Sequence, residues 1–326
     1  MNVLLSIPQT VAAWQLPLAQ VARLRARFPQ HTFIDARTPE ARAEGLGRCD
    51  VACTWTLSPA ELASAPHLRW VHSTAVAVGT LCLEALEARG VVVTNTRGVQ
   101  DAPIAEHVFA LLLALGHRLP LAWERQRTAT WAQNEFVGAE TPLPLAGRRL
   151  GVVGLGSIGT AVARLGVAFG MAVTGVRRHP EHGGPDGVTV WGADRLDDLL
   201  QASDALVLAA PLTAETDTML DARRLARLPR GAWVVNVARG PLVDERALVA
   251  ALESGVLGGA ALDVFVDEPL PSSSPLWRAP NLILTPHTAG FRPDHWDDAI
   301  AVFIENLTRW EDGAPLRWRI DPARGY

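Results

Sequence analysis

Short apolar runs alternate with longer amphipathic stretches in the first part of this chain. From the N-terminus to about residue 98, the short runs have the length and composition of strands, and the longer stretches have a helical period. This alternation predicts a parallel sheet whose strands are joined by crossover helices. The strands are expected at Val3–Ile7, Thr32–Ala36, Asp50–Thr54, Arg69–Ser73 and Val91–Thr94, and the helices at Pro17–Phe28, Ser58–Ser64 and Leu81–Arg89.

A second series of the same kind begins at Leu150. It predicts a second parallel sheet, so the fold class is α/β with two Rossmann-like or flavodoxin-like domains. The strands of this series are expected near residues 150–154, 172–176, 188–191, 205–210, 232–237, 259–263 and 282–284.

Two segments lie between the series. Asp101–Leu119 is predicted to be a long helix, with Pro103 in its first turn and an apolar surface nearly all round between Ala110 and Leu115. A helix of this kind needs cover on most sides, and a second subunit is one source of that cover. Pro120–Arg148 is rich in Trp, Pro and Thr and has no clear period, so it is predicted to be an ordered arm or loop.

Length and charge narrow the classes of protein. A chain of 326 residues is too long for one ordinary core, which predicts two domains. The formal net charge of -4, without a long basic run, argues against a nucleic-acid partner. The start has no positive region typical of a signal peptide, and no apolar run approaches the length of a membrane span. We therefore expect a soluble, cytoplasmic protein with no membrane partner.

The cysteine count excludes a disulfide framework. The chain has three cysteines, Cys49, Cys53 and Cys82, and no further cysteines or histidines complete a zinc site around them. They are expected to be buried small apolar residues, and no metal is expected.

A glycine-rich turn is the first sign of chemistry. The apolar run before it ends in Gly154-x-Gly156-x-x-Gly159, and a helical pattern follows. Gly154 suits the tight turn, Gly156 allows a pyrophosphate to touch the backbone, and Gly159 allows the helix to pack closely on the strand. Ser157 and Ile158 would begin the helix, whose free N–H groups would face the phosphates. The pattern predicts a dinucleotide site.

The choice of dinucleotide depends on the end of the next strand. An Asp or Glu about 20 residues after the glycines would bind the ribose 2′-hydroxyl of NAD, but this chain has Arg177 and Arg178 there instead. Adjacent guanidiniums suit a 2′-phosphate, although a pair of solvated surface arginines is the structural alternative. We predict that NADP(H) is preferred and that NAD(H) remains possible.

Three ionisable side chains each follow an apolar strand of the second series: Arg239, Glu268 and His287. In an open parallel sheet, this edge is where ligands bind. Each residue alone has an ordinary structural explanation, as a surface cation, a turn residue or a core histidine. Together they supply an anion clamp, a carboxylate and a proton donor, which is the set needed to reduce a 2-oxo acid with a hydride donor.

Four motifs follow the glycine fingerprint along the chain: Pro211-Leu212-Thr213-x-Glu215-Thr216, Asn236-x-x-Arg239-Gly240, Asp263-Val264-Phe265-x-x-Glu268-Pro269-Leu270 and Pro286-His287-x-Ala289-Gly290. Through these motifs, the chain from about Trp70 to Gly290 resembles the D-isomer-specific 2-hydroxyacid dehydrogenase family, and its NADP-preferring glyoxylate/hydroxypyruvate reductase-like branch in particular. The resemblance implies that His287 protonates the ketone oxygen, that Glu268 holds and charges His287, and that Arg239 binds the substrate carboxylate and polarises the carbonyl.

The resemblance also implies the domain layout and partners. Residues 1–98 and 291–326 would form the substrate domain, and residues 99–290 would form an inserted NAD(P)-binding Rossmann domain. The substrate would be a small 2-oxo or 2-hydroxy acid, and a homodimer would form through the helix 101–119. Beyond the glycine loop and the two arginines, cofactor-binding residues would be Pro211, Thr216, Val237, Ala238, Asp263 and His287.

One loop departs from the family pattern. After the strand that ends at Ser73, similar proteins carry a glycine-containing loop whose backbone N–H groups hold the substrate carboxylate. This chain has Ala77 where the family usually has glycine, and Gly79 where it usually has Asp or Glu. The N–H groups of Val76, Ala77 and Val78 are still expected to bind substrate, in a loop that accommodates the methyl group of Ala77.

Alternative functions share this scaffold. A nucleotide-sensing, corepressor-like binding protein could retain the same residues, but the chain lacks long disordered extensions for recruiting partners. A phosphonate-type dehydrogenase would use a similar anion clamp, whereas a formate dehydrogenase would have glutamine at Glu268. We favour an NAD(P)-dependent 2-oxo acid reductase. The identity of its substrate depends on loops such as 73–79, 120–145 and 290–296.

Overall fold

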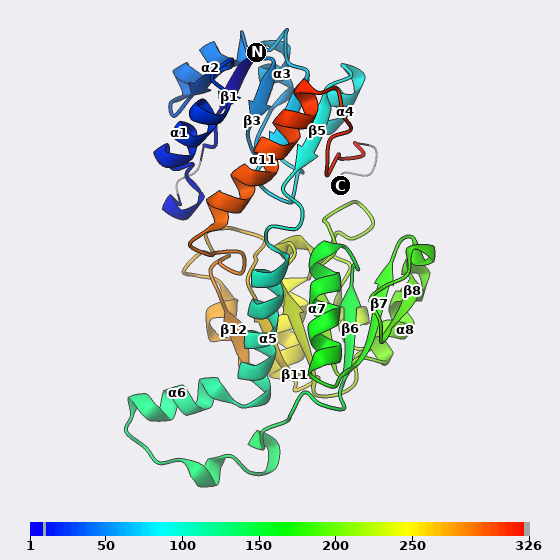
Figure 1. Ribbon diagram of the computed structural model, residues 1–326. Helices are drawn as coiled ribbons and strands as arrows, with labels where there is room; N and C mark the ends of the chain where they lie inside the picture. The colour runs from blue at the N-terminus through cyan, green and yellow to red at the C-terminus, as the bar shows by residue number, and fades with distance from the viewer. Residues whose placement is uncertain (9–10, 323–326) are drawn as a thin grey trace. The chain divides into compact units, whose positions relative to one another are not determined.

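The computed structural model of the chain describes residues 1–8 and 11–322. The chain divides into two compact units, which we call the first unit (residues 1–100 and 291–326) and the second unit (residues 101–290) (Figure 1). Each unit is built on an all-parallel sheet with helices between the strands. The prediction of an α/β fold with two parallel sheets is therefore confirmed.

The first unit has a five-stranded sheet with the order β2-β1-β3-β4-β5. This is the flavodoxin-like order, in which the chain changes direction across the sheet between β1 and β3. Its elements are β1 (Asn2–Leu5), η1 (Ala12–Trp14), α1 (Leu18–Arg27), β2 (Thr32–Asp35), α2 (Pro39–Leu46), β3 (Val51–Cys53), α3 (Pro59–Ala63), β4 (Trp70–Ser73), α4 (Leu83–Ala88), β5 (Val92–Asn95) and α11 (His295–Glu311).

An apolar cluster covers each face of this sheet, and successive strand residues point into opposite clusters. Leu4 and Val71 face one apolar cluster, whereas Val3 and Trp70 face another that includes residues of α1 and α11. Cys53 is fully buried, and burial raises the pKa of its thiol to about 12. Cys49 is also buried, while Cys82 is only half-buried.

The second unit has a seven-stranded sheet with the order β12-β11-β10-β9-β6-β7-β8, the doubly wound order of dinucleotide-binding sheets. Figure 1 shows α5 and α7 side by side against this sheet. Its elements are α5 (Asp101–Gly116), α6 (Leu119–Arg127), η2 (Gln133–Glu135), η3 (Gly138–Glu140), β6 (Arg149–Val153), α7 (Ser157–Ala168), β7 (Ala172–Arg177), η4 (Pro180–His182), β8 (Val188–Gly192), η5 (Ala193–Arg195), α8 (Leu196–Gln201), β9 (Ala205–Leu208), α9 (Ala222–Leu225), β10 (Ala232–Asn236), η6 (Gly240–Leu242), α10 (Glu245–Glu253), β11 (Leu257–Leu262), η7 (Pro275–Arg278) and β12 (Leu282–Leu284).

The segment after α5 differs from the prediction in two ways. The long helix ends at Gly116 rather than Leu119, because Arg118 adopts a left-handed conformation with φ 55°. The following segment, expected to be an arm or loop, instead begins with α6, which has Pro120 in its first turn. None of the residues of α6 is buried, so the helix has no apolar stripe facing a core and gives no clear period in the sequence.

Over the described part of the chain, no single helix is both long and apolar enough to cross a membrane. By length and composition alone, α5 and α6 pass that test as a pair bent by 69°.

Candidate functional site

The glycine turn connects β6 to α7, and its geometry explains two of its three glycines. Gly154 has φ 94°, and a Cβ there would lie 2.8 Å from the backbone of Ala210. A Cβ on Gly159 would lie 1.8 Å from the carbonyl oxygen of Gly154. A Cβ on Gly156 would meet nothing within 4 Å, so the space above this residue is open. The turn therefore packs tightly underneath and leaves its outer side accessible.

The N-terminus of α7 has the properties of an anion site. Gly156 is the N-cap and provides no side-chain acceptor, and the first turn, which contains Ser157 and Ile158, has no acidic residue. The first N–H groups of a helix lack intrahelical acceptors and carry partial positive charge. An open glycine beside these N–H groups fits the pyrophosphate of a dinucleotide.

Arg177 and Arg178 lie at the carboxyl end of β7, which pairs with β6. Nη1 of Arg177 donates a hydrogen bond to the carbonyl oxygen of Gly183 at 2.8 Å. Nη2 of Arg178 lies 3.9 Å from Oε2 of Glu215, and both side chains are largely exposed. The structure thus places two guanidiniums at the strand end where a dinucleotide fold meets the adenosine ribose.

The segment after β9 forms a closed turn. Oγ1 of Thr216 donates to the carbonyl oxygen of Pro211 at 2.7 Å and accepts from the N–H of Thr213 at 2.8 Å. This bonding fixes the segment from Pro211 to Thr216 at the same edge of the sheet as the glycine turn.

Buried Asn236 shapes the turn after β10. Its Oδ1 accepts from the N–H of Ala238 at 3.0 Å, and its Nδ2 donates to the carbonyl oxygen of Arg239 at 2.9 Å. Val237 is buried and Ala238 is half-buried. The side chain of Asn236 therefore determines where Arg239 leaves the strand.

Arg239 is half-buried beside the segment that follows β11. A Cβ on the next residue, Gly240, would lie 1.9 Å from the carbonyl carbon of Phe265, so only glycine allows this close approach. Burial lowers the pKa of the Arg239 guanidinium, and the charge of Glu268 opposes that effect. Arginine stays protonated even so, and Arg239 is a cation near Glu268.

Glu268 and His287 form a direct pair. Nδ1 of His287 lies 2.6 Å from Oε2 of Glu268, and Oε1 of Glu268 accepts from the N–H of Phe265 at 3.0 Å. Burial raises the pKa of Glu268, but the hydrogen bonds from His287 and Phe265 and the charges of His287 and Arg239 outweigh it and lower the pKa. Glu268 is therefore a carboxylate at neutral pH, and Nε2 is the ring nitrogen of His287 that does not face it.

Asp263 holds the turn that carries His287. His287 itself has a left-handed backbone conformation, with φ 54°, which is uncommon for a residue other than glycine. Asp263 is 1% exposed, and its carboxylate accepts from the N–H groups of Thr288 at 2.9 Å and Ala289 at 3.0 Å. These bonds to a buried carboxylate stabilise the turn. Asp263 therefore stabilises the backbone directly after His287.

Two further residues of this network were not predicted from the sequence. Oγ1 of Thr285 donates to Oδ1 of Asp263 at 2.6 Å, and Nε2 of His107 lies 3.0 Å from Thr285 Oγ1 and 3.6 Å from Asp263 Oδ1. His107 belongs to α5, far from Thr285 in the sequence. The one available signal was a histidine in a mostly apolar helix, directly after Glu106.

The loop of residues 73–79 begins at the last residue of β4 and belongs to the first unit. We call it the substrate loop, because the sequence predicts that its N–H groups bind substrate. In the described part of the chain, no hydrogen bond is made by the N–H groups of Val76, Ala77 or Val78. Ala77 does not have positive φ, so its methyl group fits an ordinary backbone. A Cβ on Gly79 would meet nothing within 4 Å. The loop thus offers adjacent unbonded N–H groups, as an anion site requires.

The described residues include no group of three or more His, Cys, Asp and Glu side chains that could hold a metal ion. At the ends of β10, β11 and β12, the available chemistry is that of the Arg239 guanidinium and the Glu268–His287 carboxylate–imidazole pair. These groups can bind an anion and transfer a proton.

Comparison with known proteins agrees with this arrangement. Residues 109–289 match the NAD binding domain of D-isomer specific 2-hydroxyacid dehydrogenases. A glyoxylate reductase of Korarchaeum cryptofilum is 32% identical over 316 residues, which cover 94% of this chain and 93% of that protein. A glyoxylate/hydroxypyruvate reductase B of Citrobacter koseri is 35% identical over 273 residues, 82% of this chain and 81% of that protein.

A solved structure extends the match to the whole chain. The D-isomer specific 2-hydroxyacid dehydrogenase from Xanthobacter autotrophicus Py2, in complex with NADPH and MES, has a TM-score of 0.85 and 32% sequence identity, with 100% of this chain and 99% of that chain covered. The chain therefore belongs to the D-isomer specific 2-hydroxyacid dehydrogenase family, whose members are NAD(P)-dependent oxidoreductases.

Proposed function

We propose that this protein reduces a small 2-oxo acid to a D-2-hydroxy acid with NADPH. The observation that carries the proposal is the 2.6 Å contact between His287 and Glu268, with Arg239 near the same carboxylate. The names of the relatives, glyoxylate reductase and glyoxylate/hydroxypyruvate reductase, support a small substrate. Residues 99–290 are assigned to cofactor binding, and residues 1–98 with 291–326 to substrate binding.

Each residue has a defined task in this reaction. The bound nicotinamide supplies a hydride to the carbonyl carbon. Arg239 of the second unit binds the substrate carboxylate and polarises the carbonyl. In the first unit, the N–H groups of Val76–Val78 are assigned to substrate binding. His287 donates the Nε2 proton to the carbonyl oxygen, where negative charge develops. Glu268 stabilises the imidazolium before transfer and fixes the orientation of the ring.

The proposed activity is tested with a panel of 2-oxo acids, including glyoxylate, hydroxypyruvate and bulkier side chains. Oxidation of NADPH and of NADH is followed by loss of nicotinamide absorbance, and the configuration of the product is determined. Reduction of at least one 2-oxo acid to the D-isomer supports the proposal. If no member of the panel is reduced with either cofactor, the assignment as a reductase is wrong.

Changing Glu268 to Gln is expected to move the alkaline limit of reduction to lower pH. The lowered pKa of Glu268 keeps its carboxylate charged throughout the range in which histidines titrate. That charge stabilises the imidazolium, which is the form that donates the proton. Glutamine keeps the shape but lacks the charge, so the variant should lose its proton donor as pH rises before the wild type does.

The measurement is kcat/KM for reduction as a function of pH in both proteins. The variant should retain activity on the acidic side of its profile. Alkaline limbs that superimpose would show that Glu268 does not act through His287, despite their contact.

Changing Arg177 to Asp is expected to reduce the preference for NADPH over NADH by about tenfold or more, because it removes a cation and adds an anion where the 2′-phosphate would bind. Both cofactors are compared by kcat/KM at a saturating concentration of the same 2-oxo acid. Arg246→Gln, at an exposed position of α10, is the control and should leave the ratio unchanged. A wild type that prefers NADH would refute the role of Arg177 and Arg178.

A homodimer is proposed through the region of residues 101–119, extended by α6. Helix α6 has no buried residue in the single chain. Trp123 is 53% exposed and Trp131 is 90% exposed, although large aromatic side chains usually find cover. A second copy of the chain would provide it.

A further inference from the structure

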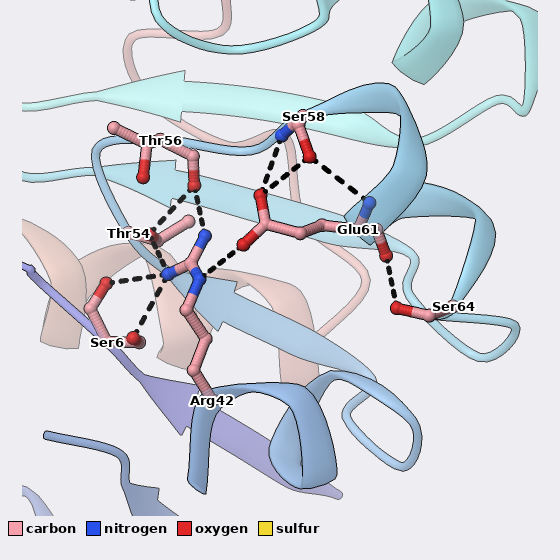
Figure 2. Close-up of polar contacts among 7 residues, drawn as sticks. All are labelled: Ser6, Arg42, Thr54, Thr56, Ser58, Glu61 and Ser64. Carbon is pink, nitrogen blue, oxygen red and sulfur yellow. Dashed lines mark hydrogen bonds and ion pairs between the residues drawn. The ribbon is translucent and has the colours of Figure 1, made fainter. Parts of the chain in front are cut away.

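A buried arginine joins three segments of the first unit. Figure 2 shows the guanidinium of Arg42, which comes from α2 and is 8% exposed, surrounded by oxygen atoms. Its Nη1 donates to Ser6 Oγ at 3.0 Å and to Thr54 Oγ1 at 2.9 Å. Its Nη2 donates to the carbonyl oxygen of Thr56, and its Nε donates to Glu61 Oε1 at 2.7 Å. A planar fork with several donors suits this set of acceptors.

Arg42 contacts the residues that follow two adjacent strands of the sheet. Ser6 follows β1 and Thr54 follows β3, and the chain changes direction between these two strands. In open α/β sheets, the crevice at this point usually receives a ligand. Here the guanidinium of Arg42 bridges the ends of the two strands through Ser6 and Thr54. Glu61 is fixed as well, because its other oxygen, Oε2, accepts from the N–H of Ser58 at 2.8 Å in the capping box of α3.

The segment held by Arg42, residues 54–57, contacts the substrate loop and the residues that follow it. Nε1 of Trp55 donates to Oγ1 of Thr74 inside the loop, and Oγ1 of Thr80 donates to the carbonyl oxygen of Trp55. The N–H of Leu57 donates to the carbonyl oxygen of Thr80 at 3.2 Å. Residues 54–57 therefore bind the substrate loop near its beginning and just beyond its end.

The loop depends on such external bonds. Its side-chain hydrogen bonds within the loop join only Ser73 and Ala75, and Asn95 Nδ2 donates to the carbonyl oxygen of Val76 at 2.6 Å from outside. Gly79, which stands in place of the usual acidic residue, contributes no side chain. The conformation of the N–H groups from Val76 to Val78 is thus determined by neighbouring segments.

We propose that Arg42 is a positioning residue for the substrate carboxylate. With Glu61 it fixes residues 54–57, and these residues fix the loop whose N–H groups bind the carboxylate. The inference rests on the proposed function, because that function assigns the N–H groups of Val76–Val78 to substrate. The carboxylate keeps its charge throughout reduction, so a displaced loop weakens binding of substrate and transition state equally. This kind of loss raises KM and leaves kcat nearly unchanged.

The test is Arg42→Lys, which keeps the positive charge and loses the fork. We expect kcat/KM for the best 2-oxo acid to fall about ten- to a hundredfold, the range a small displacement of a binding group produces. The fall should come from KM, with the dissociation constant of NADPH unchanged. Arg48→Lys is the matched control, since Arg48 is 56% exposed and pairs with Glu44 at 3.4 Å on the surface. It should leave KM unchanged.

Further variants test the contacts that connect Arg42 with the substrate loop. Trp55→Phe keeps an aromatic ring and removes the hydrogen bond to Thr74, so KM should again rise. In the double variant with Arg42→Lys, the increases should be less than additive in free energy, because both changes act on the same loop. If Arg42→Lys does not fold, Glu61→Gln keeps the size and an acceptor oxygen and removes the charge, and it should raise KM in the same direction.

A purely structural role gives a different result. If Arg42 only stabilised the fold, Arg42→Lys would lower Tm and the folded fraction, and apparent kcat would fall at constant KM. This result in a folded Arg42→Lys protein would overturn the inference. Additive effects of Arg42→Lys and Trp55→Phe would also overturn it. Binding of oxalate, an unreactive analogue of a 2-oxo acid, is measured by calorimetry with NADPH present and should weaken by the same factor as KM rises. If wild type binds oxalate but reduces no 2-oxo acid, the proposed function fails, whereas weaker binding in Arg42→Lys still supports the positioning role.

Discussion

Replacing His287 with alanine is expected to lower kcat for reduction by about two to four orders of magnitude, the usual contribution of general acid catalysis. Hydride transfer leaves negative charge on the substrate oxygen, and the alanine variant has no imidazolium to neutralise it. NADPH should still bind, since the glycine turn and the N-terminus of α7 are unchanged. Steady-state kinetics with the best 2-oxo acid and a fluorescence titration of NADPH measure the two effects separately.

A control for this experiment is His67→Ala, at an exposed position between α3 and β4. It should reduce substrate at the wild-type rate. A His287→Ala protein within about threefold of wild type would remove His287 from the mechanism, because general acid catalysis contributes far more than that. His107, which lies 3.0 Å from Thr285 Oγ1, would then be the next histidine of the second unit to test.

The sheets were predictable because their strands are short and mostly apolar, and the central strands are buried on both faces. Each strand of both sheets lies at, or within a few residues of, its predicted position. Helix α2 was not predicted, because Pro39–Leu46 has no apolar stripe. The structure shows what stabilises it instead: Thr38 caps its N-terminus, and Arg42 is buried with Glu61. A contact between residues so far apart in the chain leaves no local period in the sequence.

For the candidate site, the sequence was sufficient to predict which strand ends carry its residues. Arg239, Glu268 and His287 follow three neighbouring strands, so topology alone brings them to one edge. Neither the distances between these side chains nor the left-handed backbone of His287 could be predicted from sequence. It also did not identify His107, because the hydrogen bond to Thr285 depends on how α5 packs against the sheet.

Changing Arg239 to Lys is expected to lower kcat/KM for the 2-oxo acid by about two to three orders of magnitude. One of two charge-assisted hydrogen bonds to the carboxylate is lost, which costs about 1.5–3 kcal/mol or about ten- to a hundredfold, and polarisation of the carbonyl is lost as well. An ammonium group is also more strongly hydrated than a guanidinium, so it occupies this half-buried position less favourably. Both KM and kcat should therefore change.

This result differs from the one expected for Arg42→Lys, in which KM alone changes. The difference follows from the proposed roles: Arg239 lies near Glu268 in the second unit, whereas Arg42 contacts the segment 54–57 of the first unit. Affinity for NADPH should be unaffected in Arg239→Lys, and a fluorescence titration checks this. Loss of NADPH binding with normal substrate kinetics would place Arg239 in the cofactor site, and the anion clamp would then have to be sought among the N–H groups of Val76–Val78 alone.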